Sequence, residues 1–349
     1  MRQAGERAQV VQVGGPYFED FQIGRLYGGP AVTLTDGHAA LHQAIVGDRM
    51  RLSLDATLSL AVTGRSQPLA HPNLVGDVSI GQSTEPTFRV RGNLFYRGLV
   101  LQRSVHIGDT LRTTTEVVGL KQNRPRPDGT ATGLVALRIR TVDQDDRPVL
   151  DYWRAPMIPL RDPKVQTDHA DRFDFIPQEL QREDLHAAVP EDWSFGAARE
   201  RMPGVHAGDL AAGTVYEIEA RDTVTAAPEL ARLILNVAKT HTDAGGSAHG
   251  SRLVYGGYTI AVAAAQATRA LPNLLTILAW RSCEHTGPVF EGDILSTELT
   301  LEAVHPMQRS GEQCALLDLR AVVHAQRPGA QEPVSVTPVL DWRFVGLMA

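Results

Sequence analysis

The feature that most constrains the fold is an internal repeat. Four short motifs recur in the same order in the second half of the chain, displaced by 184 to 190 residues. The pairs are Gly24-Arg25-Leu26-Tyr27 with Gly213-Thr214-Val215-Tyr216, Gln82-Ser83-Thr84 with Gln266-Ala267-Thr268, Ile107-Gly108-Asp109-Thr110-Leu111 with Glu291-Gly292-Asp293-Ile294-Leu295, and Val149-Leu150-Asp151-Tyr152-Trp153-Arg154 with Val339-Leu340-Asp341-Trp342-Arg343. This period is far longer than that of a solenoid repeat, so the sequence predicts a duplicated domain.

The repeat divides the chain into two copies and a connection. We expect a first copy at residues 1–160, a linker at 161–212 and a second copy at 213–349. The linker is rich in Asp, Arg, Pro and Glu, and so long a connection is uncommon inside one compact domain. Four apolar residues give it anchors, namely Phe173, Phe175, Ile176 and Trp193. We therefore expect an ordered linker that wraps around the molecule.

Each copy predicts helices followed by strands. In the second copy, Thr225 and Pro228 indicate the start of a helix that carries Leu230, Leu233, Ile234 and Val237 at helical spacing. A second, alanine-rich helix at Tyr258–Ala270 is apolar all round and is expected to be buried. Strands are predicted at 274–282, 294–304, 314–325 and 334–345, and in the first copy at 93–103, 111–120, 133–142 and 149–157. A helix buried against an antiparallel sheet defines an α+β fold.

Composition excludes several classes of function. The formal net charge is −6, so no basic field is available to bind nucleic acid. The longest apolar stretches, such as Ile260–Ala265, are far shorter than the ~20 residues that span a bilayer. The segment Met1–Glu6 lacks the apolar run of a secretory signal. Because the chain has only Cys283 and Cys314, we expect a reduced protein in the cytoplasm.

Two motifs of the second copy resemble those of a known family. These are Pro288-Val289-Phe290-Glu291-Gly292-Asp293-Ile294-Leu295, and the run Arg252-Leu253-Val254-Tyr255-Gly256-Gly257 before the buried helix. They are similar to the MaoC-like, R-specific enoyl-CoA hydratase family, and most like its mesaconyl-CoA hydratase (2-methylfumaryl-CoA hydratase) branch. The resemblance implies a double hot-dog fold, in which each antiparallel sheet wraps around a central helix. It also implies a hydro-lyase that hydrates an enoyl-CoA thioester.

The resemblance further implies which copy is catalytic. The family uses an Asp and a His five positions later to hold and deprotonate water. In the first copy, Asp48 occupies the Asp position and Ser53 the His position. In the second copy, Asn236 occupies the Asp position and His241 the His position. An imidazole has useful basicity near neutral pH and a serine hydroxyl does not. At the start of the central helix, the second copy has Gly256, whose N–H can bind the thioester oxygen. The second copy is thus expected to be catalytic.

Other assignments follow from the same resemblance. Tyr255, Gly257, Arg252 and Arg97 are expected to bind substrate, with Arg252 pairing with the second carboxylate of the acyl group. No metal or redox cofactor is expected, because His241, Asp243 and His249 lack metal-ligand spacing and a fourth ligand. Coenzyme A arrives as part of the substrate. We also expect a homo-oligomer.

Two alternatives remain open from the sequence. A hot-dog thioesterase would need a carboxylate aimed at the thioester carbon, for which Asp48 and Glu284 are candidates. A non-catalytic acyl-CoA binding module would result if both motifs had decayed. The neighbouring Cys283 and His285 share a strand face at ordinary spacing and do not by themselves indicate a thiol nucleophile.

Overall fold

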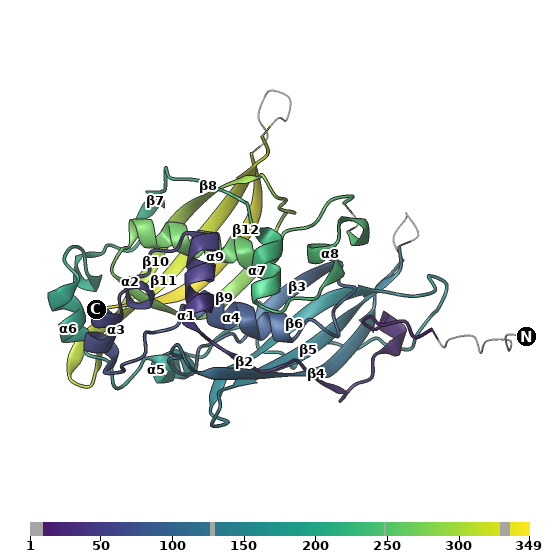
Figure 1. Cartoon of the computed structure of the whole chain (residues 1–349), viewed down its shortest axis with the longest axis horizontal. Helices are drawn as coiled ribbons and strands as arrows, with labels where there is room; N and C mark the ends of the chain where they lie inside the picture. The colour runs from purple at the N-terminus through teal and green to yellow at the C-terminus, as the bar shows by residue number, and fades with distance from the viewer. Residues whose placement is uncertain (1–9, 126–129, 248, 329–335) are drawn as a thin grey trace, which may run out of the picture.

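The computed structural model describes residues 10–125, 130–247, 249–328 and 336–349, which form two six-stranded antiparallel sheets. The first sheet has the strand order β1-β4-β5-β6-β3, and the second has the corresponding order β7-β10-β11-β12-β9. The short strands β2 and β8 pair with β4 and β10 respectively. The two halves of the chain thus fold with the same topology, as Figure 1 shows.

The strands and the central helix follow one another in the same order in both copies, but the first copy has an α-helix, α3, where the second has a short 3-10 helix at Ala244–Gly246. The first copy contains β1 (Leu26–Gly28), β2 (Val32–Thr33), α1 (Asp36–Val46), α2 (Arg51–Leu54), α3 (Ala56–Thr63), α4 (Pro72–Gln82), β3 (Gly92–Arg97), β4 (Thr110–Gln122), β5 (Thr132–Val142) and β6 (Pro148–Pro159). The second contains β7 (Val215–Glu217), β8 (Asp222–Thr223), α7 (Ala227–Leu233), α8 (Lys239–Thr242), α9 (Gly256–Ala270), β9 (Leu274–His285), β10 (Ile294–Arg309), β11 (Glu312–Gln326) and β12 (Val336–Met348). The predicted start of the last strand, at residues 334 and 335, lies outside the described residues.

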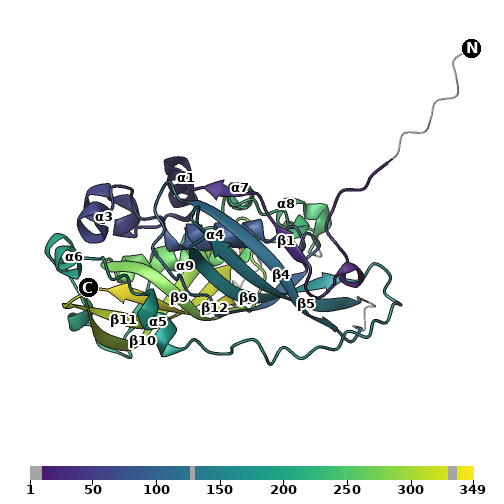
Figure 2. The same cartoon turned by 90° about the horizontal axis from the view of Figure 1, so that it is seen from below.

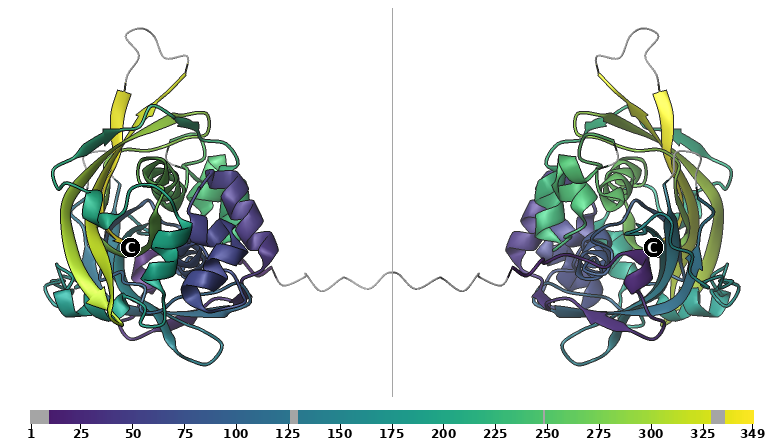
Figure 3. Two further views of the ribbon diagram at one scale, coloured as in Figure 1. Left: turned by 90° about the vertical axis from the view of Figure 1, so that its left-hand side faces the viewer. Right: turned by 90° about the vertical axis from the view of Figure 1, so that its right-hand side faces the viewer.

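The central helices α4 and α9 lie in the concavity of the sheets. Every residue of α4 is buried, and so are residues 257–268 of α9. Small residues allow this, because alanines in α9 bring its backbone close to the strands that curve around it. Figure 3 shows the curved sheet enclosing the helices in an end-on view. This is the predicted α+β, hot-dog arrangement of a sheet around a helix.

The two sheets join at their edges. The predicted strand 93–103 is shorter than expected, because Gly98 adopts a positive φ of 71° just after β3 ends at Arg97. The chain then pairs with the other copy: Leu101 N–H donates to Leu278 O at 2.8 Å, and Trp280 N–H donates to Leu99 O at 2.9 Å. The two copies therefore share backbone hydrogen bonds as well as a core.

The first helix of the second copy differs from its prediction. It begins after Ala226, which has a φ of 52°, so Thr225 is not its N-cap. The Thr225 N–H instead donates to the Tyr258 hydroxyl at 3.3 Å. The helix ends at Leu233 because Leu235 adopts a φ of 62°, and Val237 beyond it is 47% exposed.

The linker is ordered and runs along the outside of the sheets, where Figure 2 shows it crossing from the first copy to the second. It contains α5 (Arg182–Ala188) and α6 (Phe195–Arg201). Ile176 and Trp193 are buried anchors as expected, but Phe175 is 55% exposed and does not anchor the chain.

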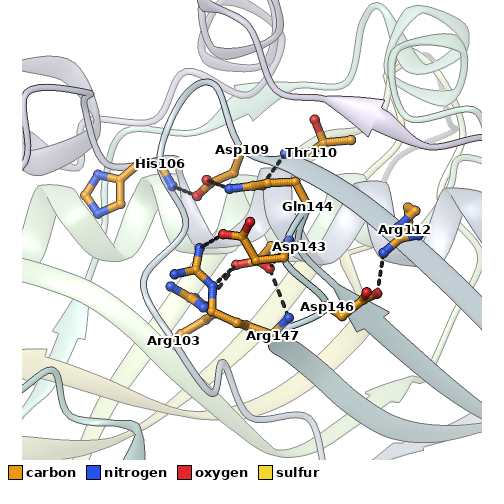
Figure 4. Close-up of polar contacts among 10 residues, drawn as sticks. Arg103, His106, Asp109, Thr110, Arg112, Asp143, Gln144, Asp146 and Arg147 are labelled. Atoms are coloured by element: carbon orange, nitrogen blue, oxygen red, sulfur yellow. Dashed lines mark hydrogen bonds and ion pairs between the residues drawn. The ribbon is translucent and has the colours of Figure 1, made fainter.

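Turns at the ends of the strands use the repeated Gly-Asp pair. Gly108 and Gly292 have φ values of 102° and 89°, which glycine adopts without strain. Asp109 accepts a hydrogen bond from His106 N–H at 2.8 Å, and Gln144 of the β5–β6 turn donates to Asp109 at 2.9 Å (Figure 4). Gly-Asp is therefore a turn motif, as the sequence suggests.

Candidate active site

The segment carrying Asn236 and His241 is a tight turn followed by the single-turn helix α8. Leu235 in the second copy and Gly47 in the first both adopt a left-handed φ, of 62° and 69°, at equivalent positions. Asn236 Oδ1 then accepts a hydrogen bond from Ala238 N–H at 3.0 Å. Asp48 Oδ1 accepts the same bond from Met50 N–H at 2.5 Å. The Asp or Asn at this position thus fixes the backbone that leads into the short helix.

His241 is held in one tautomer. Its Nδ1 lies 2.8 Å from the carbonyl oxygen of Leu253, and only a protonated Nδ1 can donate to this acceptor. In the neutral ring, Nε2 therefore carries a lone pair, and no described residue hydrogen-bonds to it. Burial lowers the pKa of His241 to about 4, against a smaller opposing effect of the Leu253 carbonyl. The ring is consequently neutral near pH 7 and has an unoccupied proton-accepting nitrogen.

The N-terminus of α9 lies beside this ring. Tyr255 immediately precedes the helix, and its ring packs edge-on against His241 with centroids 5.7 Å apart. The Gly256 N–H is the first amide of the helix, so it has no acceptor within the helix. A Cβ at Gly256 would lie 2.5 Å from His285 Nε2, and one at Gly257 would collide with Asp77 Oδ1. Both glycines are therefore required by close packing.

Asn236, His241, Tyr255 and Gly256 all line one cavity of about 310 Å³. Its other walls come from both copies. The first copy contributes Ile80, Thr84, Val90, Arg91, Gly92, Asn93, Tyr96 and Arg154, and the second adds Thr259 and residues 285–289 among others. The cavity therefore combines an imidazole, a free helix-terminal amide and a site wall built by the other copy, which together can bind and polarise a carbonyl next to a base.

The equivalent position in the first copy is filled. Leu69, Ala70, Pro72 and Val75 take the places of Leu253, Val254, Gly256 and Thr259, and the space they line is only about 20 Å³. Ala188, Pro190 and Trp193 of the linker also line it. Pro72 also lacks the N–H that Gly256 supplies. These observations support the second copy as the catalytic one.

Asp48 lies in a buried polar cluster instead of a cavity. Its Oδ2 is 3.1 Å from His71 Nε2, and His71 Nδ1 accepts a hydrogen bond from Asn73 N–H at 3.1 Å. Burial acts to raise the pKa of Asp48, but the charge and hydrogen bond of His71 outweigh it and the pKa is lowered. The His71 ring lies 5.3 Å from that of His42, whose Nε2 is 3.6 Å from Asp77 Oδ2.

Three expected substrate-binding residues lie elsewhere. Arg252 is outside the cavity lining and pairs with Glu291 on the surface, so a partner already neutralises its charge. Arg97 is also outside the lining; it stacks over the Phe95 ring at 5.1 Å. Gly257 does not line the cavity but packs beneath it against Asp77. The prediction for Arg252 rests on its proximity to Gly256 in sequence and that for Arg97 on its charge alone, and neither specifies the direction of a side chain.

The carboxylates that a thioesterase would need are not at this site. Asp48 is 2% exposed and bound to His71, and neither Asp48 nor Glu284 lines the cavity. Cys283 is buried in the core, and burial raises the pKa of its thiol well above the usual range. The geometry therefore gives no described carboxylate or thiolate aimed at a thioester bound in this cavity.

Sequence reasoning left several polar lining residues unassigned, among them His285, the buried Arg154 and the exposed Arg91. His285 is at the end of β9, where only the close approach to Gly256 reveals its place in the site. Arg154 belongs to the first copy, and the repeat around it indicates by itself only a feature of the strands. The signal that identifies it is an asymmetry of the repeat, because Phe344 occupies the equivalent strand position in the second copy.

In the described part of the chain, the fold and the cavity define two hot-dog copies that together line a site with an imidazole and a helix-terminal amide. Sequence comparison identifies the family of the chain. The chain is 31% identical over 295 residues to β-methylmalyl-CoA dehydratase of Chloroflexus aurantiacus, covering 80% of each chain. It is 30% identical over 286 residues to mesaconyl-CoA hydratase of Cereibacter sphaeroides, covering 80% of this chain and 81% of the relative. The chain belongs to this MaoC-like family of hydro-lyases, although no protein-family model matches it.

Solved structures agree with the fold. A conserved hypothetical protein of Mycobacterium tuberculosis, described as having a double hotdog fold, is 48% identical with a TM-score of 0.86, covering 97% of this chain and 100% of that one. A protein from Chloroflexus aurantiacus described as a MaoC domain dehydratase is 26% identical with a TM-score of 0.79, covering 97% and 99%. In the described part of this chain, no helix is long and apolar enough to cross a membrane.

Proposed function

We propose that this protein reversibly hydrates mesaconyl-CoA to β-methylmalyl-CoA. The observation that carries the proposal is the position of His241, which lines the same cavity as Gly256 and whose Nε2 has no hydrogen-bond partner in the described chain. The curated relatives named for this substrate and product, at 31% and 30% identity, support the choice of acyl group. The absence of Asp48 and Glu284 from the cavity lining disfavours thioester hydrolysis.

The proposed chemistry uses the neutral imidazole as a base. His241 Nε2 accepts a proton from water, and the hydroxide oxygen forms a bond to the β-carbon of the enoyl group. The electron pair of the double bond moves to the thioester oxygen, where the Gly256 N–H and the N-terminus of α9 stabilise the enolate. The imidazolium then returns its proton to the α-carbon. The net change is the addition of one water, with His241 restored.

Asn236 would orient the water. Its Oδ1 is engaged by Ala238 N–H, which leaves the Nδ2 amide, without a partner among the described residues, to donate to the water oxygen. Because an amide does not titrate near neutral pH, the proton that moves belongs to His241. Tyr255 contributes its ring to the wall, since its hydroxyl donates to Asp77 and burial raises its pKa well above the usual value.

The proposed reaction needs no metal or redox cofactor, and coenzyme A enters as part of the substrate. The free, buried thiols of Cys283 and Cys314 support a reducing compartment such as the cytoplasm. Assembly into a homo-oligomer stays a prediction.

Purified protein incubated with mesaconyl-CoA tests the proposal. Hydration removes the absorbance of the enoyl thioester without releasing a thiol, and mass spectrometry finds a product heavier by one water. Release of free coenzyme A would instead identify a thioesterase. Tight binding without turnover across several enoyl-CoA compounds would identify a binding module. Either outcome would overturn the proposal.

A further inference from the structure

Arg154 is a buried cation that has no carboxylate partner among the described residues. Its side chain is 4% exposed, yet it is absent from the ion pairs in this part of the chain. Its three hydrogen bonds all leave from Nη2, and they reach neutral acceptors: Ser83 O at 2.7 Å, Ser83 Oγ at 2.9 Å and Thr87 Oγ1 at 3.2 Å. Nε is buried without a hydrogen-bond partner in the described chain. Burial of a charge in this state is costly unless an anion joins it.

The fold does not require a charge at this position. Arg154 pairs across the sheet with Tyr96, and at the equivalent place in the second copy Phe344 pairs with Trp280. Phe344 is fully buried and stacks on Trp342 with ring centroids 4.0 Å apart. The inward face of this strand therefore accepts an apolar residue without difficulty. Packing of the sheet therefore does not account for the buried arginine at the equivalent position of the first copy. The cavity that Arg154 lines can account for it.

Arg154 lines the same cavity as His241, Tyr255 and Gly256. Its Nη2 is held against the C-terminal end of α4, where the Ser83 carbonyl and the negative pole of the helix favour a cation. Both paired edges of a guanidinium include Nη2, and Nε is buried, so this anchoring leaves Nη1, which has no hydrogen-bond partner among the described residues, as the nitrogen that can donate to a ligand. A charge-assisted hydrogen bond from Nη1 to a carboxylate is strong, and the attraction between the two charges increases where water is excluded.

We propose that Arg154 binds the free carboxylate of the acyl group and thereby selects dicarboxylic acyl-CoA thioesters over monocarboxylic ones. This inference rests on the proposed function, because it names the substrate class of the same cavity. It assigns to the first copy the recognition of the acyl end and to the second copy the chemistry at the thioester. The phosphates of coenzyme A are the other anions of the substrate. A buried guanidinium such as that of Arg154 suits them less well than an exposed basic side chain does.

Binding of two stable thioesters tests this assignment without turnover. Succinyl-CoA carries a terminal carboxylate that butyryl-CoA lacks, while both carry the same phosphates. By isothermal titration, wild-type protein should bind succinyl-CoA at least about tenfold more tightly, and Arg154→Met should abolish this preference while retaining affinity for butyryl-CoA. Equal weakening of both ligands would place the phosphates at Arg154, and an unchanged preference would place the carboxylate elsewhere. Each result would overturn the proposal.

Turnover provides the second measurement. Arg154→Met should lower kcat/KM for mesaconyl-CoA at least about tenfold more than it lowers kcat/KM for crotonyl-CoA. Arg154→Lys should retain part of the wild-type preference for mesaconyl-CoA. Arg138→Gln is the matched control, because Arg138 pairs with Asp151 at 2.6 Å outside the cavity, and it should change neither substrate. If the wild-type protein hydrates neither compound, the proposed function is wrong. The assignment of Arg154 is still tested in that case by the binding of succinyl-CoA and butyryl-CoA.

Circular dichroism and thermal unfolding of Arg154→Met should show a folded protein. If the variant does not fold, Arg154→Lys carries the test in both assays, since it keeps the charge but loses the second terminal nitrogen, so one ammonium cannot hold Ser83 as Nη2 does and also donate to the ligand as Nη1 would. A selectivity change in Arg252→Gln with none in Arg154→Lys would return the carboxylate to the surface arginine and refute the assignment.

Discussion

The Tyr255 hydroxyl donates a hydrogen bond to Asp77 Oδ1 over 3.0 Å, and this bond crosses from the second copy of the repeat to the first. Asp77 lies on α4 and is buried, with its other oxygen 3.6 Å from His42 Nε2. The wall of the cavity beside His241 is thereby fixed by a carboxylate of the first copy. Both central helices consequently contribute to one site.

Replacement of Tyr255 by Phe should reduce stability more than activity. The substitution leaves the buried Asp77 carboxylate without its donor, which costs about 1–3 kcal/mol of unfolding free energy. The ring remains against His241, so kcat should stay within about threefold if hydration follows the proposed route. Urea unfolding and the hydration assay measure the two effects.

Tyr258→Phe is the matched control for this variant. The Tyr258 hydroxyl donates to the Thr225 carbonyl at 2.9 Å and accepts from the Thr225 N–H at 3.3 Å, and because both partners are neutral its loss should cost about 1–2 kcal/mol. If Tyr255→Phe instead slowed turnover by about two orders of magnitude without loss of stability, the hydroxyl would be acting on the substrate.

His241→Gln should lower kcat by about 10²–10⁴-fold, because the general base is removed. Its melting temperature should stay within a few degrees, since the glutamine amide can still donate toward Leu253 O. Ser53→Ala, at the equivalent place in the first copy, should leave the rate unchanged. Near-normal turnover in a folded His241→Gln protein would reject the assignment of the base.

The pH profile should reflect the lowered pKa of His241. The base must be neutral to accept a proton, so activity is present above its pKa and is lost as the pH falls through it. With a pKa of about 4, about 90% of the ring is neutral at pH 5, whereas a histidine of ordinary pKa 6.5 would be only about 3% neutral. We therefore expect kcat/KM to be maintained from pH 7 to pH 5, with tryptophan fluorescence confirming a folded protein.

Asn236→Asp provides a direct control of this interpretation. A carboxylate near the ring favours the protonated imidazole and raises its pKa, so the acid limb of the profile should move to higher pH. A profile that falls near pH 6.5 in the wild type, or one that Asn236→Asp does not move, would mean that His241 does not control the reaction.

Gly256→Ala should impair catalysis strongly. The added methyl would lie 2.5 Å from His285 Nε2 and would force the start of α9 or His285 to move. Displacement of the amide from its oxygen should slow turnover by up to about 100-fold. Gly76→Ala in α4 meets no atom within 4 Å and should stabilise the protein slightly without affecting the rate. Equal kinetics of the two alanine variants would show that the Gly256 amide is not used.

Asp48→Asn should affect stability and leave catalysis nearly intact. The amide oxygen can still accept from Met50 N–H, but the pairing with His71 is lost inside the core. We expect the unfolding free energy to decrease by about 1–3 kcal/mol, and turnover to change by less than about threefold. A large loss of rate in the folded variant would instead give the first copy a role in the chemistry.

Much of the fold was accessible from local sequence. The repeat of Gln82 and Gln266, and of Asp109 and Asp293, reveals the duplication because equivalent turns and helix ends need the same side chains. The alanine-rich pattern of Tyr258–Ala270 predicts a buried helix because small residues allow close packing. Helix limits were less predictable: the backbone turns at Ala226 and Leu235 result from packing and have no glycine to indicate them.

The catalytic motif illustrates the division between sequence and structure. Sequence alone determined the duplication, and the family resemblance implied the hot-dog fold of each copy. The differences between Ser53 and His241 and between Pro72 and Gly256 pointed to the second copy as the catalytic one, because basicity and a backbone N–H are properties of the residues themselves. Only the tertiary structure decided which charges face the cavity. It directs Arg252 to Glu291 on the surface and buries Arg154 beside the site, because side-chain direction depends on strands and helices that meet from distant parts of the chain.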